Sequence, residues 1–370
     1  MGALTDVVED LCAFAGRGSC TDAERRAALW LHDDLRARGH EAWVETVWVR
    51  PQWWWSLFWH AGLGVVASLL STASAPAGVA IAAVAFVSYG LELAGLGGIV
   101  RLLFFRRATQ VVVVEPPDPG AIALWLTAAT DAPRRGLVFR DGWRRIGGRL
   151  RPGPLWWVLI MLALVTATAV ARLLGAEGPG LGVVQFVPTV VLLLAATAAL
   201  DIGLSEPSPG ASADASGVSL ALALHQELLD RPPEKLSPGL VLAGAGELFP
   251  YGFRRHLQVE RPPPRDTVIL ELGPVGDGTP AWTTRHPQLV HACIEAADGA
   301  VRHRVNRPTA AAAGRWRRIP GVEVRCIDGR GIPPRARTEH DTPDRVDEPA
   351  IERAYDFCLA MVDALDADLA

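Results

Sequence analysis

Four long apolar stretches constrain this chain more than any other feature of its sequence. They cover residues 54–73, 77–100, 155–174 and 181–200, and they form two closely spaced pairs. An α-helix rises about 1.5 Å per residue, so about 20 apolar residues cross the roughly 30 Å hydrocarbon core of a bilayer. Each pair therefore predicts a transmembrane helical hairpin, and the lipid bilayer is an expected partner of the chain.

The polar segments outside the hairpins are long enough to form one domain. Residues 1–52, 101–153 and 201–370 together number about 280, which suffices for a single hydrophobic core. The hairpins at 53–100 and 154–200 then interrupt this domain. A T-x-x-E capping box at Thr21 and Glu24 starts a helix, and buried-type strands such as 110–114 alternate with further helices. This alternation predicts an α/β fold, with a three-layer α/β/α arrangement around a mostly parallel central sheet.

Positive charges lie beside the ends of the hairpins that connect to the polar segments. Arg50, Arg101, Arg106 and Arg107 flank the first hairpin, and Arg140, Arg144 and Arg145 precede the second. The short turns inside the hairpins carry only Glu177. Because arginines near helix ends stay in the cytoplasm, the polar domain is expected on the cytoplasmic side of the inner (plasma) membrane.

A run of basic and aromatic residues, RRGLVFRDGWRRIGGRLR at 134–151, precedes the second hairpin. Such a run also suits nucleic acid, but the net charge of −4 gives the whole chain no nucleic-acid signature. Its place between membrane spans favours anionic lipid headgroups instead. We predict that 136–150 is the end of a strand running into a membrane-surface segment, and that nucleic acid is not a partner.

Two ionisable side chains fall inside the first hairpin. His60 lies about 10 Å and Glu92 about 13 Å from the cytoplasmic helix ends, at 1.5 Å per residue. Ionisable groups within a membrane commonly pair with one another or mark a pathway. The two are therefore expected to pair, either as a structural contact or as a proton or ligand site.

Five segments of the polar chain carry motifs in a recognisable order. They are TAATDAPRRG at 127–136, PGASADASGV at 209–218, LAGAGELFPYG at 242–252, LELGPVGDG at 270–278 and RTEHDTPDRVD at 337–347. Together they resemble the corresponding segments of the two-zinc aminopeptidase family of clan MH. The resemblance covers nearly all of the polar chain and implies an aminopeptidase-like α/β/α fold.

The resemblance also implies a reaction centre that this sequence lacks. In the family two His, a shared Asp, a Glu and a further Asp hold two zinc ions, and a second Glu is the general base. Here the ligand positions hold Ala129, Ala213, Gly273 and Arg337, and the position of the general base holds Gly246. Methyl groups cannot coordinate zinc, and an arginine repels a cation.

The preferred hypothesis is a membrane-anchored pseudopeptidase without catalytic residues, metal or cofactor. Asp131, Asp214, Glu247 and Asp341 remain at its motif positions as relics, and only Glu247 keeps a ligand identity. In a binding or scaffolding role, the cleft would hold a peptide or the chain end of a partner such as a membrane protein, or it would simply persist as part of the fold. The charge of Arg337 would attract a carboxylate.

Two alternatives remain open. In one, Asp214, Glu247 and His340 hold a single zinc ion in an active aminopeptidase or amide hydrolase with a rebuilt metal site. In the other, the spanning helices associate with a transporter or another membrane complex, and His60 and Glu92 take part.

Overall fold

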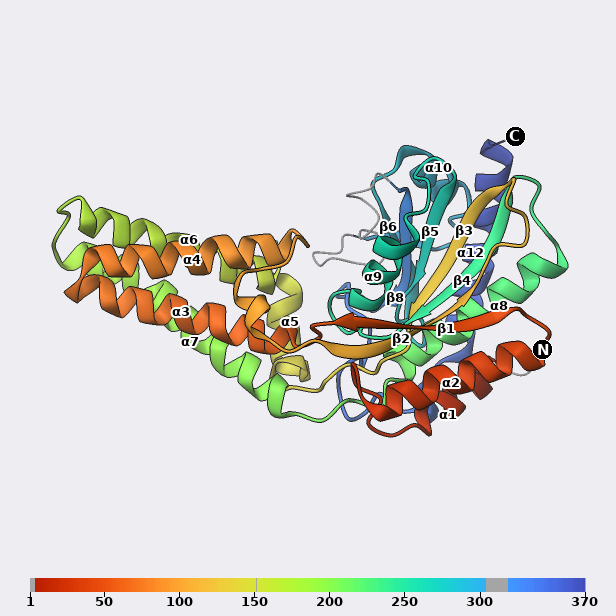
Figure 1. Ribbon diagram of the computed structural model, residues 1–370, viewed down its shortest axis with the longest axis horizontal. Coiled ribbons are helices and arrows are strands. Elements are labelled where there is room, and N and C mark those ends of the chain that lie inside the picture. The colour runs from red at the N-terminus through yellow and green to blue at the C-terminus, as the bar shows by residue number, and fades with distance from the viewer. Residues whose placement is uncertain (1–3, 151, 304–318, 370) are drawn as a thin grey trace. The chain divides into compact units, whose positions relative to one another are not determined.

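Within residues 4–150, 152–303 and 319–369, which the computed structural model describes, the strands form one eight-stranded sheet (Figure 1). They are β1 (Ala42–Val49), β2 (Arg107–Val114), β3 (Ile122–Ala129), β4 (Leu236–Ala243), β5 (Thr267–Leu272), β6 (Thr279–Thr284), β7 (Val301–Arg302) and β8 (Gly321–Ile327). Their order in the sheet is β1-β2-β4-β3-β5-β8-β6-β7. The central strands β4, β3, β5 and β8 are parallel, whereas β1 pairs antiparallel with β2, β2 with β4, and β6 with β8.

Helices cover both faces of this sheet. One face packs against α1 (Leu4–Cys12), α2 (Asp22–Ala37), α8 (Ser216–Asp230), α10 (Pro287–Glu295) and α12 (Glu348–Asp368), and the other against α9 (Tyr251–Glu260). In β2, Val112 and Val114 face the first group, while Val111 and Val113 face α9. The central strands are thus buried on both sides, which explains their continuous apolar runs. The predicted three-layer fold is confirmed.

The chain divides into two compact units. The α/β unit comprises Met1–Pro51, Arg106–Arg135 and Glu206–Ala370, and the helical unit comprises Gln52–Phe105 and Gly136–Ser205. The helical unit therefore also includes Gln52, 101–105, 136–153 and 201–205, which lie outside the predicted hairpins. Arg151, the last residue of the predicted basic run, lies outside the described residues.

In the described part of the chain, four helices are long and apolar enough to cross a membrane. They are α3 (Trp53–Ala73), α4 (Ala75–Leu93), α6 (Pro154–Leu173) and α7 (Pro179–Leu204). Large apolar side chains such as Leu69 and Val183 point outward, whereas Ser68 and Gln185 are buried between the helices. Apolar residues outside and polar residues inside suit a hydrocarbon surrounding rather than water.

Two sequence predictions on this unit are wrong in detail. The second span, predicted over 77–100, ends at Leu93, because Gly95 and Gly97 adopt φ angles of +79° and +85° that terminate the helix. Residues 136–150 contain no strand end: a short 3₁₀ turn at Leu137–Phe139 precedes helix α5 (Asp141–Arg149). A helix bonds its own backbone, which this segment needs because it pairs with no strand.

A polar network joins three of these four long apolar helices. Gln185 on α7 accepts a hydrogen bond from Arg172 Nε on α6 at 2.9 Å. Its amide nitrogen lies 2.5 Å from the Ser68 carbonyl oxygen and 3.1 Å from Ser71 Oγ, both on α3. Arg172 is thereby held at the bundle by a side chain that also links two other helices.

Gln185→Ala is therefore expected to destabilise the helical bundle. Hydrogen bonds between membrane helices are worth about 0.6 kcal/mol each, so loss of these contacts should cost about 2 kcal/mol. Thermal unfolding of the full chain in detergent measures this cost. Leu194→Ala, which removes an outward-facing side chain from the same helix, is the control. Equal stability of the two variants would contradict the network.

Candidate functional site

The parallel strands β3, β4, β5 and β8 end at one edge of the sheet, where α/β proteins commonly build ligand sites. A recess lies at this edge. It is lined by Thr127, Ala128, Ala129, Ala243, Gly244, Gly246, Pro250, Phe253 and Glu271. Small and apolar side chains dominate this lining, and two of the lining positions, 129 and 246, are those where the aminopeptidase motifs lack their expected residues.

Ala129 and Gly246 are packed directly against each other. A Cβ atom placed on Gly246 would lie 2.6 Å from the Ala129 Cβ and 3.3 Å from Asp131 Oδ1. Carbon atoms in a packed interior do not approach to 2.6 Å, so a glutamate at 246 requires the loop to move. The present backbone therefore leaves no room for a general base at this position.

Asp131 is fully buried beside this contact and holds the neighbouring loops. Its carboxylate accepts hydrogen bonds from Ser19 Oγ at 2.5 Å, Gly246 N at 2.5 Å and Glu247 N at 3.2 Å. Burial raises the pKa of Asp131 above its ordinary value, although these donors favour the ionised form. The relic aspartate thus fixes the loop after β4.

Glu247 is the only motif position that has the residue type of a zinc ligand, and it forms a buried ion pair with Arg337. Arg337 Nη1 lies 2.9 Å from Glu247 Oε1, and Arg337 Nη2 donates to the Glu247 carbonyl oxygen. The Glu247 side chain is 2% exposed and that of Arg337 15%. Glu247 Oε1 also accepts from Arg134 N at 2.9 Å. The carboxylate that Arg337 attracts therefore belongs to this chain.

Asp341 and Asp214 lie at the start of α8. Asp341 Oδ1 accepts from Ser212 N at 2.7 Å and Oδ2 from Ala213 N at 3.2 Å, which satisfies backbone groups just before the helix. Asp214 Oδ2 is buried and makes no hydrogen bond within the described residues. Desolvation, and after it the Asp131 carboxylate, raises the pKa of Asp214 well above its ordinary value.

The structure does not assemble the alternative single-metal site. His340 is exposed, and among the described residues it forms no group of ligand atoms with Asp214 and Glu247. Glu247 Oε1 already bonds to a guanidinium, which competes with any cation.

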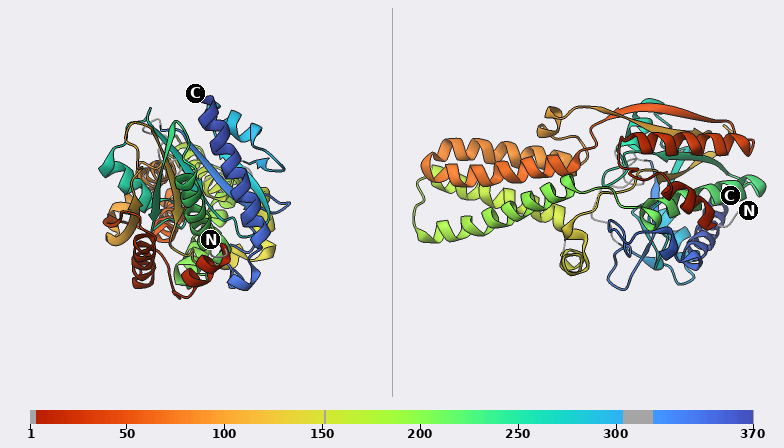
Figure 2. Two further views of the ribbon diagram at one scale, coloured as in Figure 1. Left: turned by 90° about the vertical axis from the view of Figure 1, so that its right-hand side faces the viewer. Right: turned by 90° about the horizontal axis from the view of Figure 1, so that it is seen from below.

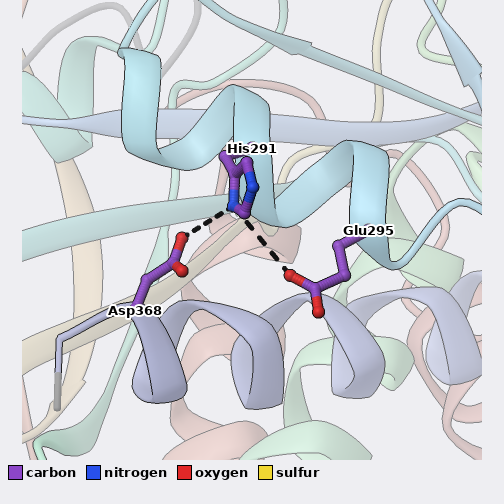
Figure 3. A group of neighbouring side chains, drawn as sticks. All are labelled: His291, Glu295 and Asp368. Atoms are coloured by element: carbon purple, nitrogen blue, oxygen red, sulfur yellow. Dashed lines mark hydrogen bonds and ion pairs between the residues drawn. The ribbon is translucent and has the colours of Figure 1, made fainter.

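One group of three possible metal ligands does occur in the described part of the chain, but elsewhere (Figure 3). His291 and Glu295 come from α10, and Asp368 from the end of α12. His291 Nδ1 lies 3.0 Å from Asp368 Oδ2 and 3.9 Å from Glu295 Oε2. All three residues are exposed, so this cluster is a surface ion-pair group.

The residues at the motif positions do not fit two zinc ions. Zinc requires nitrogen, sulfur or anionic oxygen at about 2.0–2.3 Å. Ala129, Ala213, Gly246 and Gly273 offer no such side-chain atom. A Cβ on Gly273 would lie 3.5 Å from Glu323 Oε1, an ordinary contact distance, so this position has room for a Cβ, unlike Gly246.

Glu24 has a role at this edge that the sequence revealed only in part. Thr21 caps α2 through a bond from Glu24 N to Thr21 Oγ1 at 3.2 Å, as the capping box predicts. The buried Glu24 carboxylate also accepts from Cys20 N at 2.6 Å, Thr109 Oγ1 at 2.7 Å and Ala245 N at 2.8 Å. The last two contacts are distant in sequence, and no local pattern signals them.

In the helical unit, His60 and Glu92 join one network without bonding to each other. His60 Nε2 lies 2.8 Å from Ser88 Oγ, and His60 Nδ1 lies 2.7 Å from the Ser56 carbonyl oxygen. Glu92 Oε2 accepts from Ser56 Oγ, and Glu92 Oε1 pairs with Arg101 Nη1 at 3.0 Å. The expected direct pair is thus replaced, because the chain turns back after α4 and brings Arg101 to the carboxylate.

No family model and no curated protein matches this sequence. Several solved structures are similar to it in fold. A glutaminyl cyclase from Bacteroides thetaiotaomicron bound to N-acetylhistamine has a TM-score of 0.56 at 12% identity, over 98% of this chain and 96% of that one. A Zn-dependent exopeptidase from Parabacteroides distasonis has 0.54 at 11%, over 96% and 95%. A leucine aminopeptidase precursor from Bacteroides thetaiotaomicron has 0.54 at 12%, over 98% and 96%.

The chain has an aminopeptidase-like fold. At 10–12% identity these likenesses show the fold alone, and they agree with the fold that the five motifs implied. The aminopeptidase-like unit therefore keeps the architecture of zinc exopeptidases and glutaminyl cyclases, while the residues at its motif positions differ from a zinc-binding set.

Arg337→Ala is expected to destabilise the α/β unit by about 3 kcal/mol, because it leaves the buried Glu247 carboxylate without its counter-charge. Adding Glu247→Gln should recover much of that loss. A double-mutant cycle of chemical unfolding measures the coupling, with the exposed Arg330→Ala as a control for lost surface charge. Strictly additive effects would show that the two side chains do not interact.

Asp214→Asn is expected to stabilise the α/β unit at neutral pH. A folded-state pKa above the unfolded value gives a stabilising contribution that is complete below about pH 4 and is lost as pH rises through the folded pKa. Asparagine avoids the buried charge, so the gain in stability should grow as the pH rises from about 4 to 8. Unfolding in detergent between about pH 4 and pH 8 measures how this stability difference depends on pH. The exposed Asp363→Asn is the control. A gain independent of pH would contradict the assignment.

Proposed function

We propose that this chain is a membrane-anchored, non-catalytic aminopeptidase-like protein that binds a peptide segment or a membrane protein. The observation that carries the proposal is the ion pair between Arg337 and Glu247. It places a permanent cation of this chain against the one carboxylate that a zinc ion would use. Arginine stays protonated at any physiological pH, so its guanidinium competes with a metal ion for this carboxylate.

The recess supports binding rather than hydrolysis. Hydrolysis by a metallopeptidase needs a metal-bound water and a base that removes its proton. The close contact of Ala129 with Gly246 excludes a base at that position, and the neighbouring donors are engaged in holding loops. What remains is a small, largely apolar recess with Glu271 in its lining, which would admit no more than one small group of a bound partner.

The helical unit supports anchoring. Its four long helices carry outward apolar side chains, and hydrocarbon is the surrounding in which that surface is stable. The arginines beside the polar segments support a cytoplasmic α/β unit on the inner membrane.

Metal analysis combined with activity assays tests the loss of catalysis. We expect the full chain, purified in detergent with zinc present, to hold no stoichiometric zinc after dialysis. It should turn over neither aminoacyl substrates nor peptides with N-terminal glutamine, the reaction classes named by its structural neighbours. His291→Ala removes the exposed cluster, so zinc that persists in this variant would lie elsewhere. Two zinc ions per chain with aminopeptidase turnover in that variant would overturn the proposal.

Protease treatment tests the orientation. Trypsin added to intact spheroplasts should leave the α/β unit whole, and trypsin added to inverted membrane vesicles should digest it. The short turn at Gly175, between α6 and α7, should lie on the opposite side. Digestion of the α/β unit in intact spheroplasts would refute the cytoplasmic assignment.

A further inference from the structure

The segment that follows α4 presents apolar side chains in a fixed conformation. Arg101 pairs with Glu92 at 3.0 Å, and Val100 N donates to Ser88 Oγ at 3.0 Å, so the backbone of the 3₁₀ turn at Val100–Leu103 is bonded to the hairpin. Leu102 and Leu103 then point outward and are 65% and 80% exposed. Phe105, just beyond, is 87% exposed. In water this surface would be unfavourable, so it requires an apolar surrounding.

Helix α5 presents a second surface of mixed character. Trp143 and Ile146, three residues apart and hence on one side of the helix, are 61% and 55% exposed. Arg140, at the start of the helix, and Arg145, on another side of it, are also exposed. Figures 1 and 2 show α5 running across the long direction of the spanning helices of the same unit. If those helices cross a bilayer, α5 lies in the plane of its surface.

Both surfaces belong to the same end of the bundle. Tyr89 Oη, near the end of α4, donates to the Leu155 carbonyl oxygen at the start of α6, at 3.1 Å. Leu137 N, just before α5, donates to Asp201 Oδ2 in the last turns of α7, at 2.6 Å. The segments that contain Phe105 and Trp143 therefore both leave the bundle where α4 and α7 end and α6 begins.

We propose that these two surfaces form a collar that binds the headgroup boundary of an anionic lipid leaflet. The collar consists of Leu102, Leu103, Phe105, Arg140, Trp143, Arg145 and Ile146. Its apolar and indole side chains enter the interface, while Arg140 and Arg145 bind lipid phosphates. The inference rests on the membrane anchoring proposed above and adds a lipid selectivity to it. Continuity with the spanning helices favours lipid over a soluble partner.

Hydrogen exchange on the full chain in nanodiscs tests the collar. Peptides covering 137–146 should exchange more slowly in discs of phosphatidylcholine with phosphatidylglycerol than in phosphatidylcholine alone. Arg140→Gln with Arg145→Gln should abolish that difference. It should also lower the amount of phosphatidylglycerol that co-purifies, since each arginine near an anionic surface contributes about fivefold in affinity. Arg265→Gln with Arg330→Gln, which removes the same charge from exposed positions of the α/β unit, should change neither measurement.

The outcomes separate the collar from the anchoring. If wild-type peptides 137–146 exchange equally in both lipids while the chain stays in the discs, the collar is wrong and the anchoring stands. If the chain does not stay in the discs, the anchoring fails first. An equal loss of protection in both double variants would assign the effect to net charge and overturn the proposal.

Discussion

Buried carboxylates that accept backbone hydrogen bonds hold the carboxyl edge of the sheet together. Asp131 binds the N–H groups of Gly246 and Glu247, and Asp341 binds those of Ser212 and Ala213. Unpaired buried N–H groups are costly, so these loops depend on the two aspartates for their conformation. This role is structural and does not require a metal.

The carboxylates at this edge of the sheet are balanced by less positive charge than two zinc ions would supply. Two zinc ions would bring about four positive charges to this cluster, whereas the Arg337 guanidinium brings one. Glu247 is neutralised by it, but Asp131 and Asp214 are left in a desolvated, acidic surrounding, and their pKa values are raised accordingly. This edge of the sheet thus has a cluster of carboxylates, as a metal centre does, but its positive charge comes from an arginine side chain.

The helical unit is apolar at its surface as well as in its core. Leu162 and Leu192 are buried and Leu69 and Val183 are exposed, while the polar side chains of Gln185 and His60 are buried. The prediction of four long apolar helices is confirmed, because length and apolar composition are properties of the local sequence. It failed at the end of α4, where residues 94–100 are still apolar enough to extend a span but two glycines end the helix. Apolar composition alone therefore does not predict the residue at which such a helix ends.

The sequence by itself determined the four apolar helices, the alternating α/β pattern and the motif order, because periodicity and composition are local properties. It also determined which donor atoms are missing at the motif positions, since an alanine lacks them in any conformation. Only the tertiary structure decided that Arg337 reaches Glu247 and that Arg101, not His60, reaches Glu92. Both pairs join residues whose distance depends on how loops fold back, and long flexible side chains choose among partners by packing and desolvation, which no local pattern encodes.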